Sequence, residues 1–520
     1  MFASVRGSRM GAFVYTSTVT TIVQILASIG GGCALWAAHE PLGWWPLVFV
    51  SLGLLWHITF QASPLRAFSL GFMWGLGFFL PHLDWAITAS NSLLAMVALA
   101  VSQAVFSGLL GIVWAQLSHL SHTYAWIFAG FAWSGYEHLR GSLPFGGMPW
   151  GKIAFALNDS ALVRLAPVGS TLLVGLVAAW ISILLAYTVS NARSGPFVSV
   201  MSASLATMIL VAPLMLPIGG KPLGTINVGI VQGNTPSKQE IPDGYERALR
   251  VTQQHADMAG QISGAELVVF PESTSDRDVR TDPEAGGIIR STAAHAGVPI
   301  LFGTQEYTQD GRYNDYLAMT PDGTITDRYS KQHPVPFGEY IPMRQFFSGM
   351  SDTVAAIVKQ VSIDMLPGHK PAYIHVPYRG EALAIATPIC FEVAYDAIVA
   401  EGVRGETVPA QLIVVPTNNA SFGESGEPYQ QFAMTRFRAI EHGRSAIQVS
   451  TTGTSGLVDS KGNVTYVSDI FVQDVRTVPV VLHNHLTLAA RYSTFLEYLG
   501  YVCVAIGLGA AIAGWRAKLT

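Results

Sequence analysis

Long apolar stretches are the feature that most constrains how this chain folds. They recur through the first 217 residues, and one more lies close to the C-terminus. A transmembrane α-helix needs about 20 consecutive apolar residues to cross the hydrocarbon core of a bilayer. The pattern predicts a multi-span α-helical membrane domain. Eight transmembrane helices are expected, near residues 14–38, 43–61, 67–89, 92–117, 123–139, 167–190, 197–217 and 495–515.

The segment between the last two apolar stretches has a different composition. Charged residues make up only 12% of the whole chain, against about 25% in soluble proteins, and most of them lie in this segment. The chain is therefore expected to divide into a membrane domain with seven transmembrane helices at 1–222, a globular domain at 223–488 and a C-terminal transmembrane helix at 489–520. The first stretch is too long for the apolar region of a typical signal peptide, so we expect it to stay as a span.

Basic residues in the short loops predict the orientation. Arg6 and Arg9 precede the first stretch, Arg66 and Arg193 lie in later loops, and Arg516 follows the last stretch. The positive-inside rule then places both termini in the cytoplasm and the globular domain outside. The loop at 140–150 breaks the rule by placing Arg140 outside. Two interpretations of that loop stay open: a functional segment, or a Gly/Pro-rich turn resting on the membrane.

Strand-like and helix-like segments alternate in the globular part. This alternation is typical of an α/β layered fold in which helices cover the sheets. Strands are expected at 227–231, 266–270, 299–302, 382–386, 411–415, 446–450 and 456–459, and helices at 244–263, 283–296 and 429–443.

Three residues near the ends of these strands carry chemistry. Glu272 and Cys390 each follow a strand, and Lys331 follows a Pro-Asp-Gly turn. A thiol is a good nucleophile once deprotonated, and a helix start after Cys390 together with a cation would favour the thiolate. A carboxylate can carry the proton, and a fixed ammonium can stabilise an oxyanion. Each residue alone is more often structural, so the argument depends on all three contexts together.

Those contexts resemble the nitrilase superfamily. Further matches are Val231-Gln-Gly-Asn234, Pro336-Phe-Gly-Glu339, Ile389-Cys-Phe-Glu392, Asn418-Asn-Ala-Ser-Phe-Gly423 and Met148-Pro-Trp150. Seven apolar stretches before the globular part and one after it narrow the resemblance to the membrane-bound branch, the apolipoprotein N-acyltransferases. The resemblance implies an exported nitrilase-like αββα sandwich on an eight-helix membrane domain, in the bacterial cytoplasmic (inner) membrane.

The resemblance also implies a reaction. A phospholipid of the membrane would donate an acyl chain to a cysteine thiol, and the thioester would acylate the α-amino group of the S-diacylglyceryl-cysteine of an apolipoprotein. Carried over to this sequence, Cys390 is the nucleophile, Glu272 the general base and Lys331 the oxyanion stabiliser. Glu339 and Glu392 are supporting carboxylates. Substrate contacts are expected from Phe391, Phe422, Trp150 and Asn314.

Some positions depart from the family pattern. Phe391 stands where a tyrosine is frequent, and Ser421 stands where an aromatic residue often precedes Phe422. A tryptophan that is common shortly after the Gln-Gly-Asn motif is also absent. These departures leave the three catalytic contexts intact and affect the expected preference for lipid chains and acceptors.

Two alternatives use the same sequence features differently. A membrane-tethered amidase or nitrilase would employ the same three residues on small amides, although such substrates do not require eight spans. A transporter or receptor would show broken helices with paired charges near the bilayer midplane. The sequence contains no His-Glu-x-x-His, Cys-x-x-Cys or Walker A motif and no basic run, so we expect no metal, no cofactor and no nucleic-acid partner.

Overall fold

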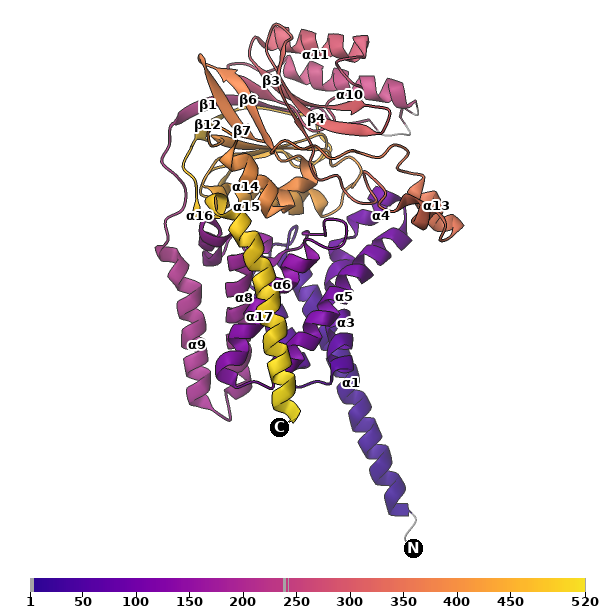
Figure 1. Ribbon diagram of the computed structural model, residues 1–520, viewed down its shortest axis with the longest axis vertical. Helices are drawn as coiled ribbons and strands as arrows, with labels where there is room; N and C mark the ends of the chain where they lie inside the picture. Colours follow the sequence, from indigo (N-terminus) through magenta and orange to yellow (C-terminus); the bar gives the residue numbers. More distant parts are fainter. Residues whose placement is uncertain (1–3, 237–239, 242, 520) are drawn as a thin grey trace.

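A helical part and a two-sheet part are stacked along the long axis of the molecule in the computed structural model (Figure 1). The structure describes residues 4–236, 240–241 and 243–519, with side chains from residue 21 onward. The side chains of Arg6 and Arg9, on which part of the orientation depends, lie outside the described residues. Both ends of the chain lie below the helical part, on the side opposite the sheets.

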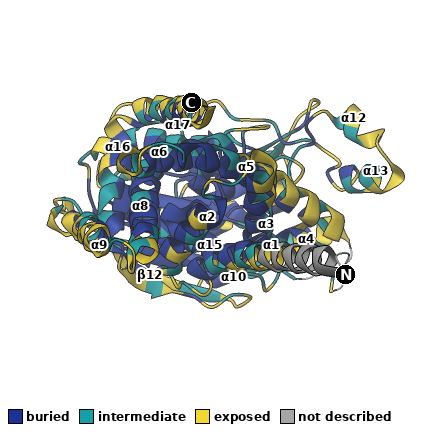
Figure 2. Cartoon of the chain, turned by 90° about the horizontal axis from the view of Figure 1, so that it is seen from below, coloured by how far each residue is buried: buried dark blue, intermediate teal, exposed yellow. Residues whose placement is uncertain are grey.

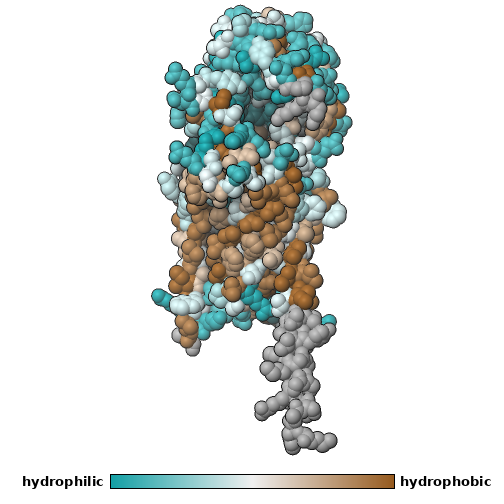
Figure 3. Space-filling view, turned by 90° about the vertical axis from the view of Figure 1, so that its right-hand side faces the viewer, coloured by the Kyte–Doolittle hydropathy of each residue, from teal (hydrophilic) through white to brown (hydrophobic). Residues whose placement is uncertain are grey.

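A helix covers most of each of the eight predicted apolar stretches. The helices are α1 (Ser4–Ala38), α2 (Leu47–Thr59), α3 (Pro64–His82), α5 (Leu93–Leu117), α6 (His122–Arg140), α8 (Ala166–Asn191), α9 (Pro196–Val211) and α17 (Ser493–Leu519). Within the described residues, five helical segments are long and apolar enough to cross a membrane: Thr21–Ala38, Leu93–Leu117, Ala161–Asn191, Pro196–Met215 and Ser493–Leu519. On the face drawn in Figure 3, a belt of apolar side chains covers this part, with polar surface above and below it.

The third predicted stretch, 67–89, is wrong as a single helix. The structure ends α3 at His82 and starts a separate short helix, α4 (Trp85–Ser90), three residues later. Pro81 lies in the last turn of α3, and a proline inside a helix removes a backbone donor and clashes with the preceding turn. The break leaves α4 beside the two-sheet part of the molecule rather than in line with α3 (Figure 1).

Two six-stranded sheets form the upper part. Their strand orders are β12-β1-β2-β3-β4-β5 and β11-β10-β9-β8-β7-β6. The strands are β1 (Gly224–Gln232), β2 (Leu267–Val269), β3 (Ile300–Tyr307), β4 (Arg312–Met319), β5 (Ile325–Ser330), β6 (Tyr373–Tyr378), β7 (Glu381–Ala386), β8 (Leu412–Thr417), β9 (Ala446–Ser450), β10 (Gly456–Val458), β11 (Val464–Val467) and β12 (Asp474–Leu482). The central pairs β1–β2, β2–β3, β7–β8 and β8–β9 are parallel.

The sheets pack face to face between two layers of helices. Ile226 and Val228 of one sheet and Ile385 and Val414 of the other belong to one buried cluster between them. The helices α10 (Gly244–Ala259) and α11 (Pro283–Ala296) cover the first sheet, and α14 (Asp396–Arg404) and α15 (Glu427–His442) cover the second. This order of layers confirms the predicted αββα arrangement.

The helix α15 joins the two parts of the molecule. It packs on the second sheet and also on α8 and on α7 (Ile153–Ala156). Asn158 donates a hydrogen bond to the carbonyl of Ala433 on α15 at 2.8 Å, and Lys152 pairs with Asp396 at 2.9 Å. Seen from below, α2, α3, α8 and α15 form the buried centre, while α9 is largely exposed at the edge (Figure 2). The two-sheet part is thus held on the helical part by buried polar contacts as well as by apolar packing.

Candidate active site

Cys390 lies at a sharp turn after the buried strand β7. The residue has a φ of 54°, in the left-handed region that L-residues rarely adopt, and its side chain is buried. A 3-10 turn (Cys390–Ala394) follows, and α14 starts only at Asp396. A helix thus starts at Cys390 as predicted, but it is a 3-10 helix, and α14 begins six residues later. The strained turn presents the thiol at the end of the strand, and surrounding contacts must hold that conformation.

Glu392 supplies those contacts. Its carboxylate is fully buried and connects the turn at Cys390 with the segment that follows Lys331. The donors are the hydroxyl of Tyr329 at 2.8 Å and the backbone N–H groups of Ile389 at 2.8 Å, Gln332 at 2.7 Å and His333 at 3.0 Å. A single carboxylate therefore fixes the two segments that carry the thiol and the ammonium relative to each other.

We expect Glu392→Gln to destabilise the protein strongly. The amide group of glutamine would point N–H donors at backbone N–H groups, so at least one or two charge-assisted hydrogen bonds would be lost, each with a value of about 1.5–3 kcal/mol. The apparent unfolding temperature in detergent measures the effect, and Glu406→Gln on the exposed surface is the matched control. Equal unfolding temperatures for the two variants would contradict this role for Glu392.

Glu272 follows β2 and points at the thiol. Its carboxylate accepts a hydrogen bond from the side-chain amide of Asn314 at 2.6 Å and another from the backbone N–H of Asn418 at 2.8 Å. Burial raises the pKa of Glu272, and Lys331 offsets part of that rise. Asn314, which the sequence places among the substrate contacts, thus lies on the carboxylate, with its buried amide oxygen unpartnered among the described residues.

Lys331 follows β5 and is fully buried. Its ammonium nitrogen lies 2.6 Å from Glu339 Oε1 and 3.5 Å from Glu272 Oε1. Burial alone lowers the pKa of Lys331, but Glu339 and Glu272 outweigh it and raise the pKa above the usual lysine value. The ammonium is therefore charged and held in place by two carboxylates, as a fixed oxyanion donor requires.

The thiol of Cys390 is protonated at rest. Burial raises its pKa, the carboxylate of Glu272 raises it further, and Lys331 offsets only part of this. The side-chain amide of Gln431 donates a hydrogen bond to the sulfur at 3.5 Å. The arrangement can thus transfer the thiol proton to Glu272 as the sulfur attacks, and it does not store a free thiolate.

Activity should rise with pH on the acid side. Because burial raises the pKa of Glu272, the carboxylate is lost as a base at a higher pH than an ordinary glutamate, whose pKa is about 4.3. We expect the acid limb of kcat/KM to lie above that value. Initial rates over a pH series in detergent measure it, and a rate that stays constant down to about pH 4 would contradict the expectation.

Aromatic side chains lead away from the thiol toward the helical part. Phe391 stacks on Trp150 with ring centroids 5.6 Å apart and an interplanar angle of 7°. Trp150 contacts Trp85 of α4 at 5.7 Å, and Trp85 contacts Phe422 at 5.3 Å. The structure therefore links Phe391, Trp150 and Phe422 through Trp85, and their role as substrate contacts stays a prediction. The sequence did not single out Trp85 for this aromatic group, because Trp85 falls within the predicted transmembrane stretch 67–89.

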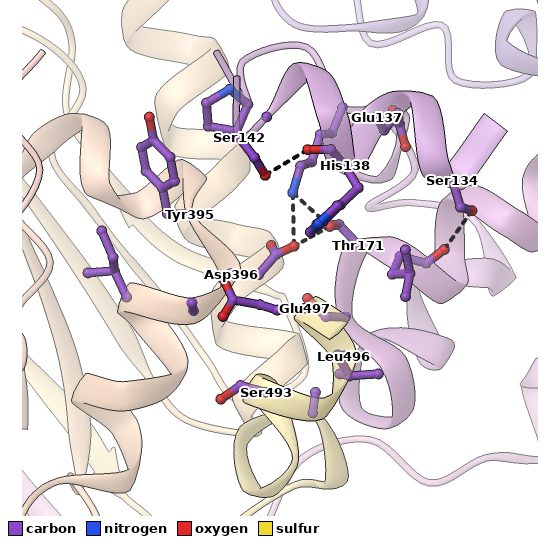
Figure 4. Close-up of a pocket in the computed structure, with 18 of the residues that line it drawn as sticks. Ser134, Glu137, His138, Ser142, Thr171, Tyr395, Asp396, Ser493, Leu496 and Glu497 are labelled. Carbon is purple, nitrogen blue, oxygen red and sulfur yellow. Dashed lines mark hydrogen bonds and ion pairs between the residues drawn. The ribbon is translucent and has the colours of Figure 1, made fainter. Parts of the chain in front are cut away.

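A separate cavity lies where the helical part meets α14 and α17 (Figure 4). It has a volume of about 330 Å³, and the three catalytic candidates are not among its lining residues. Lys152 bridges Asp396 and the hydroxyl of Thr171 inside it, at 2.9 and 3.1 Å. The rings of His333 and Tyr395, 4.2 Å apart, both line its wall. The cavity thus contains one of the ion pairs that join the two parts of the molecule.

No metal cluster accompanies the site. Among the described residues, no group of three or more His, Cys, Asp and Glu side chains is arranged to hold a metal ion. The chemistry that the geometry offers is acyl transfer by a thiol, a carboxylate and an ammonium.

Comparisons with known proteins found matches over both parts of the chain. Residues 31–184 match the family model described as apolipoprotein N-acyltransferase N-terminal domain, and residues 227–484 match the carbon-nitrogen hydrolase model. The chain is 30% identical to the apolipoprotein N-acyltransferase of Mycolicibacterium smegmatis, over 95% of this chain and 85% of that one. It is 29% identical to that of Methylococcus capsulatus, over 94% and 95%. An amidase structure from Nesterenkonia sp. matches 54% of this chain and 98% of its own, at 16% identity and a TM-score of 0.37.

Proposed function

The chain belongs to the apolipoprotein N-acyltransferase family, and on that premise we propose that it transfers an acyl chain from a membrane phospholipid, through a thioester on Cys390, to the α-amino group of the S-diacylglyceryl-cysteine of apolipoproteins. The observation that carries this proposal is the buried arrangement in which Glu272 meets both the thiol of Cys390 and the ammonium of Lys331. The proposed reaction has two half-reactions at one sulfur.

The first half-reaction forms the thioester. Glu272 takes the proton of the Cys390 thiol while the sulfur attacks the ester carbonyl of the phospholipid. Lys331 stabilises the negative oxygen of the tetrahedral intermediate. The carbon–oxygen bond then breaks, and Glu272 returns the proton to the departing lysophospholipid oxygen.

The second half-reaction uses the same groups in the opposite order. The α-amino group of the acceptor attacks the thioester carbonyl and passes a proton to Glu272. The carbon–sulfur bond breaks, the amide is released, and the proton returns to the sulfur of Cys390. Lys331 keeps its charge throughout, because Glu339 holds it at 2.6 Å.

Membership of this family also decides between the acyltransferase and the amidase interpretations. The match at residues 31–184 covers the helical part from the end of α1 to most of α8, and a hydrolase of small soluble amides does not require these helices. A lipid-bound donor and a lipid-bound acceptor both reach a site at the membrane surface by diffusion in the plane of the bilayer. The aromatic residues from Phe391 to Phe422 offer an apolar surface for an acyl chain.

We further propose an arrangement in the membrane. Eight spans, including the short α2 and the more polar α3 and α6, place the two-sheet domain outside and both termini in the cytoplasm. The proposed boundaries are 1–222, 223–488 and 489–520. Arg66, Arg193, Arg516 and Lys518 support this orientation through the positive-inside rule. Single-cysteine labelling at Arg193→Cys and at the exposed Glu406→Cys, in intact and opened cells, would test it.

Mass spectrometry of the intact protein tests the reaction. We expect purified protein incubated with a phospholipid to gain the mass of one acyl chain, and to lose it when a diacylglyceryl lipopeptide is added. Loss of the adduct should coincide with N-acylation of the lipopeptide. A folded protein with a free thiol that forms no adduct would rule out a phospholipid donor, and release of the adduct as free fatty acid only would favour a hydrolase.

A further inference from the structure

A buried carboxyl group that the proposed reaction does not use lies at the base of the loop carrying Phe422. This loop connects β8 with α15, and Glu427 is the first residue of α15. Glu427 is only 1% exposed. The side-chain amide of Asn419, at the other end of the loop, donates a hydrogen bond to Glu427 Oε2 at 2.7 Å. The two ends of the loop are thereby tied together.

Further hydrogen bonds connect Asn419 with the sulfur of Cys390. The same amide nitrogen of Asn419 lies 3.0 Å from Gln431 Oε1, and the hydroxyl of Thr417 donates to that oxygen at 2.7 Å. Because Gln431 Oε1 accepts from two donors, the other end of its amide must be the NH₂ group. That group donates to Cys390 Sγ at 3.5 Å. A continuous set of hydrogen bonds thus runs from Glu427 to the nucleophile.

The orientation of Asn419 is fixed independently. Its amide oxygen accepts a hydrogen bond from the hydroxyl of Ser450 at 2.6 Å, so its NH₂ group has to face Glu427 and Gln431. Asn419 therefore needs an acceptor at Glu427. Without that acceptor one N–H of a buried amide would lose its partner, and the amides of Asn419 and Gln431 would be free to rotate.

The charges around Glu427 favour its neutral form. Among the described residues no cation pairs with it, and the ammonium of the site is shared by Glu339 and Glu272. A buried carboxylate without a cation is costly. Burial raises the pKa of Glu427 to about 8, Asn419 lowers it in part, and the charge of Glu272 raises it.

We propose that Glu427 is a positioning residue that acts as a neutral carboxylic acid: through Asn419 and Gln431 it holds an amide N–H on the sulfur of Cys390, and its ionisation opposes formation of the thiolate. The charged or titratable groups that act on it are Glu272 and Cys390, and His82 lies behind the neighbouring Gln430, 3.4 Å from its amide. Glu272 already carries one negative charge near the sulfur. Ionised Glu427 would add another, and the two together would make the negatively charged thiolate of Cys390 harder to form.

Alkylation of Cys390 by iodoacetamide tests the proposal without any acyl donor. In a Cys33→Ser, Cys503→Ala background, Cys390 is the only thiol. An alkylation rate that follows the thiolate rises about tenfold per pH unit below the thiol pKa. With Glu427 present we expect the rise to be less than tenfold per pH unit near pH 8, where Glu427 ionises, and with E427Q to keep its tenfold slope through that region. E427L should be alkylated about three- to tenfold more slowly across the range, because Asn419 loses its acceptor.

Glu424→Gln, an exposed change in the same loop, is the matched control and should follow the parent profile. Parallel profiles for E427Q and the parent would overturn the proposal, and so would a parent profile with no change of slope. If E427L folds poorly, the comparison of the alkylation profiles of E427Q and the parent still tests the proposal. The proposal takes Cys390 as the nucleophile of the proposed function. Alkylation reports the environment of this thiol whatever the donor, so failure of the phospholipid adduct would leave this test standing.

Discussion

Replacement of Cys390 by alanine is expected to reduce N-acylation by about 10⁴-fold or more. In the proposed reaction the thiol forms the covalent intermediate, and a methyl group cannot form any thioester. The fold should tolerate the change, because the side chain loses only one heavy atom and the turn is held by the backbone contacts of Glu392. Acyl-adduct formation and lipopeptide N-acylation, measured on the same purified sample, give the result.

The matched control for this variant is Cys503→Ala. Cys503 is also buried, but it lies in α17, remote in sequence and fold from the site. It should keep parental activity and form the adduct. An acyl adduct on the Cys390→Ala protein would assign the thioester to another residue, and turnover within tenfold of the parent would exclude the covalent route.

Glu272→Gln is the second large effect, with an expected loss of about 10³-fold in the acylation step. The glutamine cannot accept the thiol proton. It also brings an NH₂ group against one of two donors, either the amide of Asn314 or the backbone N–H of Asn418, because these bind different oxygens of Glu272. One carboxylate partner of Lys331 is lost as well, while Glu339 remains at 2.6 Å. Single-turnover acylation, followed by intact mass, separates this step from transfer to the acceptor.

Glu284→Gln on the surface of α11 serves as the comparison, since its side chain is exposed. It should leave the acylation rate within about twofold of the parent. A Glu272→Gln protein that folds, keeps its thiol reduced and acylates at more than one tenth of the parental rate would remove Glu272 from the proton transfer.

The sequence predicted the strands of the two sheets unevenly, for a physical reason. The parallel central strands β1, β2, β8 and β9 are buried on both faces and read as continuous apolar runs, so their positions were clear. The missed strands include β4, which begins Arg-Tyr-Asn-Asp, and β5, which has polar residues at most positions. Their pairing depends on neighbouring strands and not on their own composition.

The site could be predicted only as far as the motifs reach. The residue types and order of Glu272, Lys331 and Cys390 pointed to one chemistry before any geometry was known. The left-handed turn at Cys390 is not visible in the sequence, because a cysteine gives no sign of a positive φ. Gln431 and Glu427 were also missed, since α15 shows the ordinary pattern of an amphipathic helix and only the folded loop brings its first turns to the sulfur.

The stack of Trp150 on Phe391 has a consequence for which acceptors can be used. Trp150 also donates a hydrogen bond to Gln430 of α15 at 2.7 Å, so this residue of the helical part is held to the two-sheet part both by the ring of Phe391 and by α15. The position of the sulfur relative to the helical part is thereby fixed, and in the proposed membrane arrangement its depth in the bilayer is fixed as well. The amine must come to that depth, and the distance between the acceptor's lipid and its amino group acts as a ruler: a spacer inserted there should remove a peptide from reach even though its chemistry is unchanged.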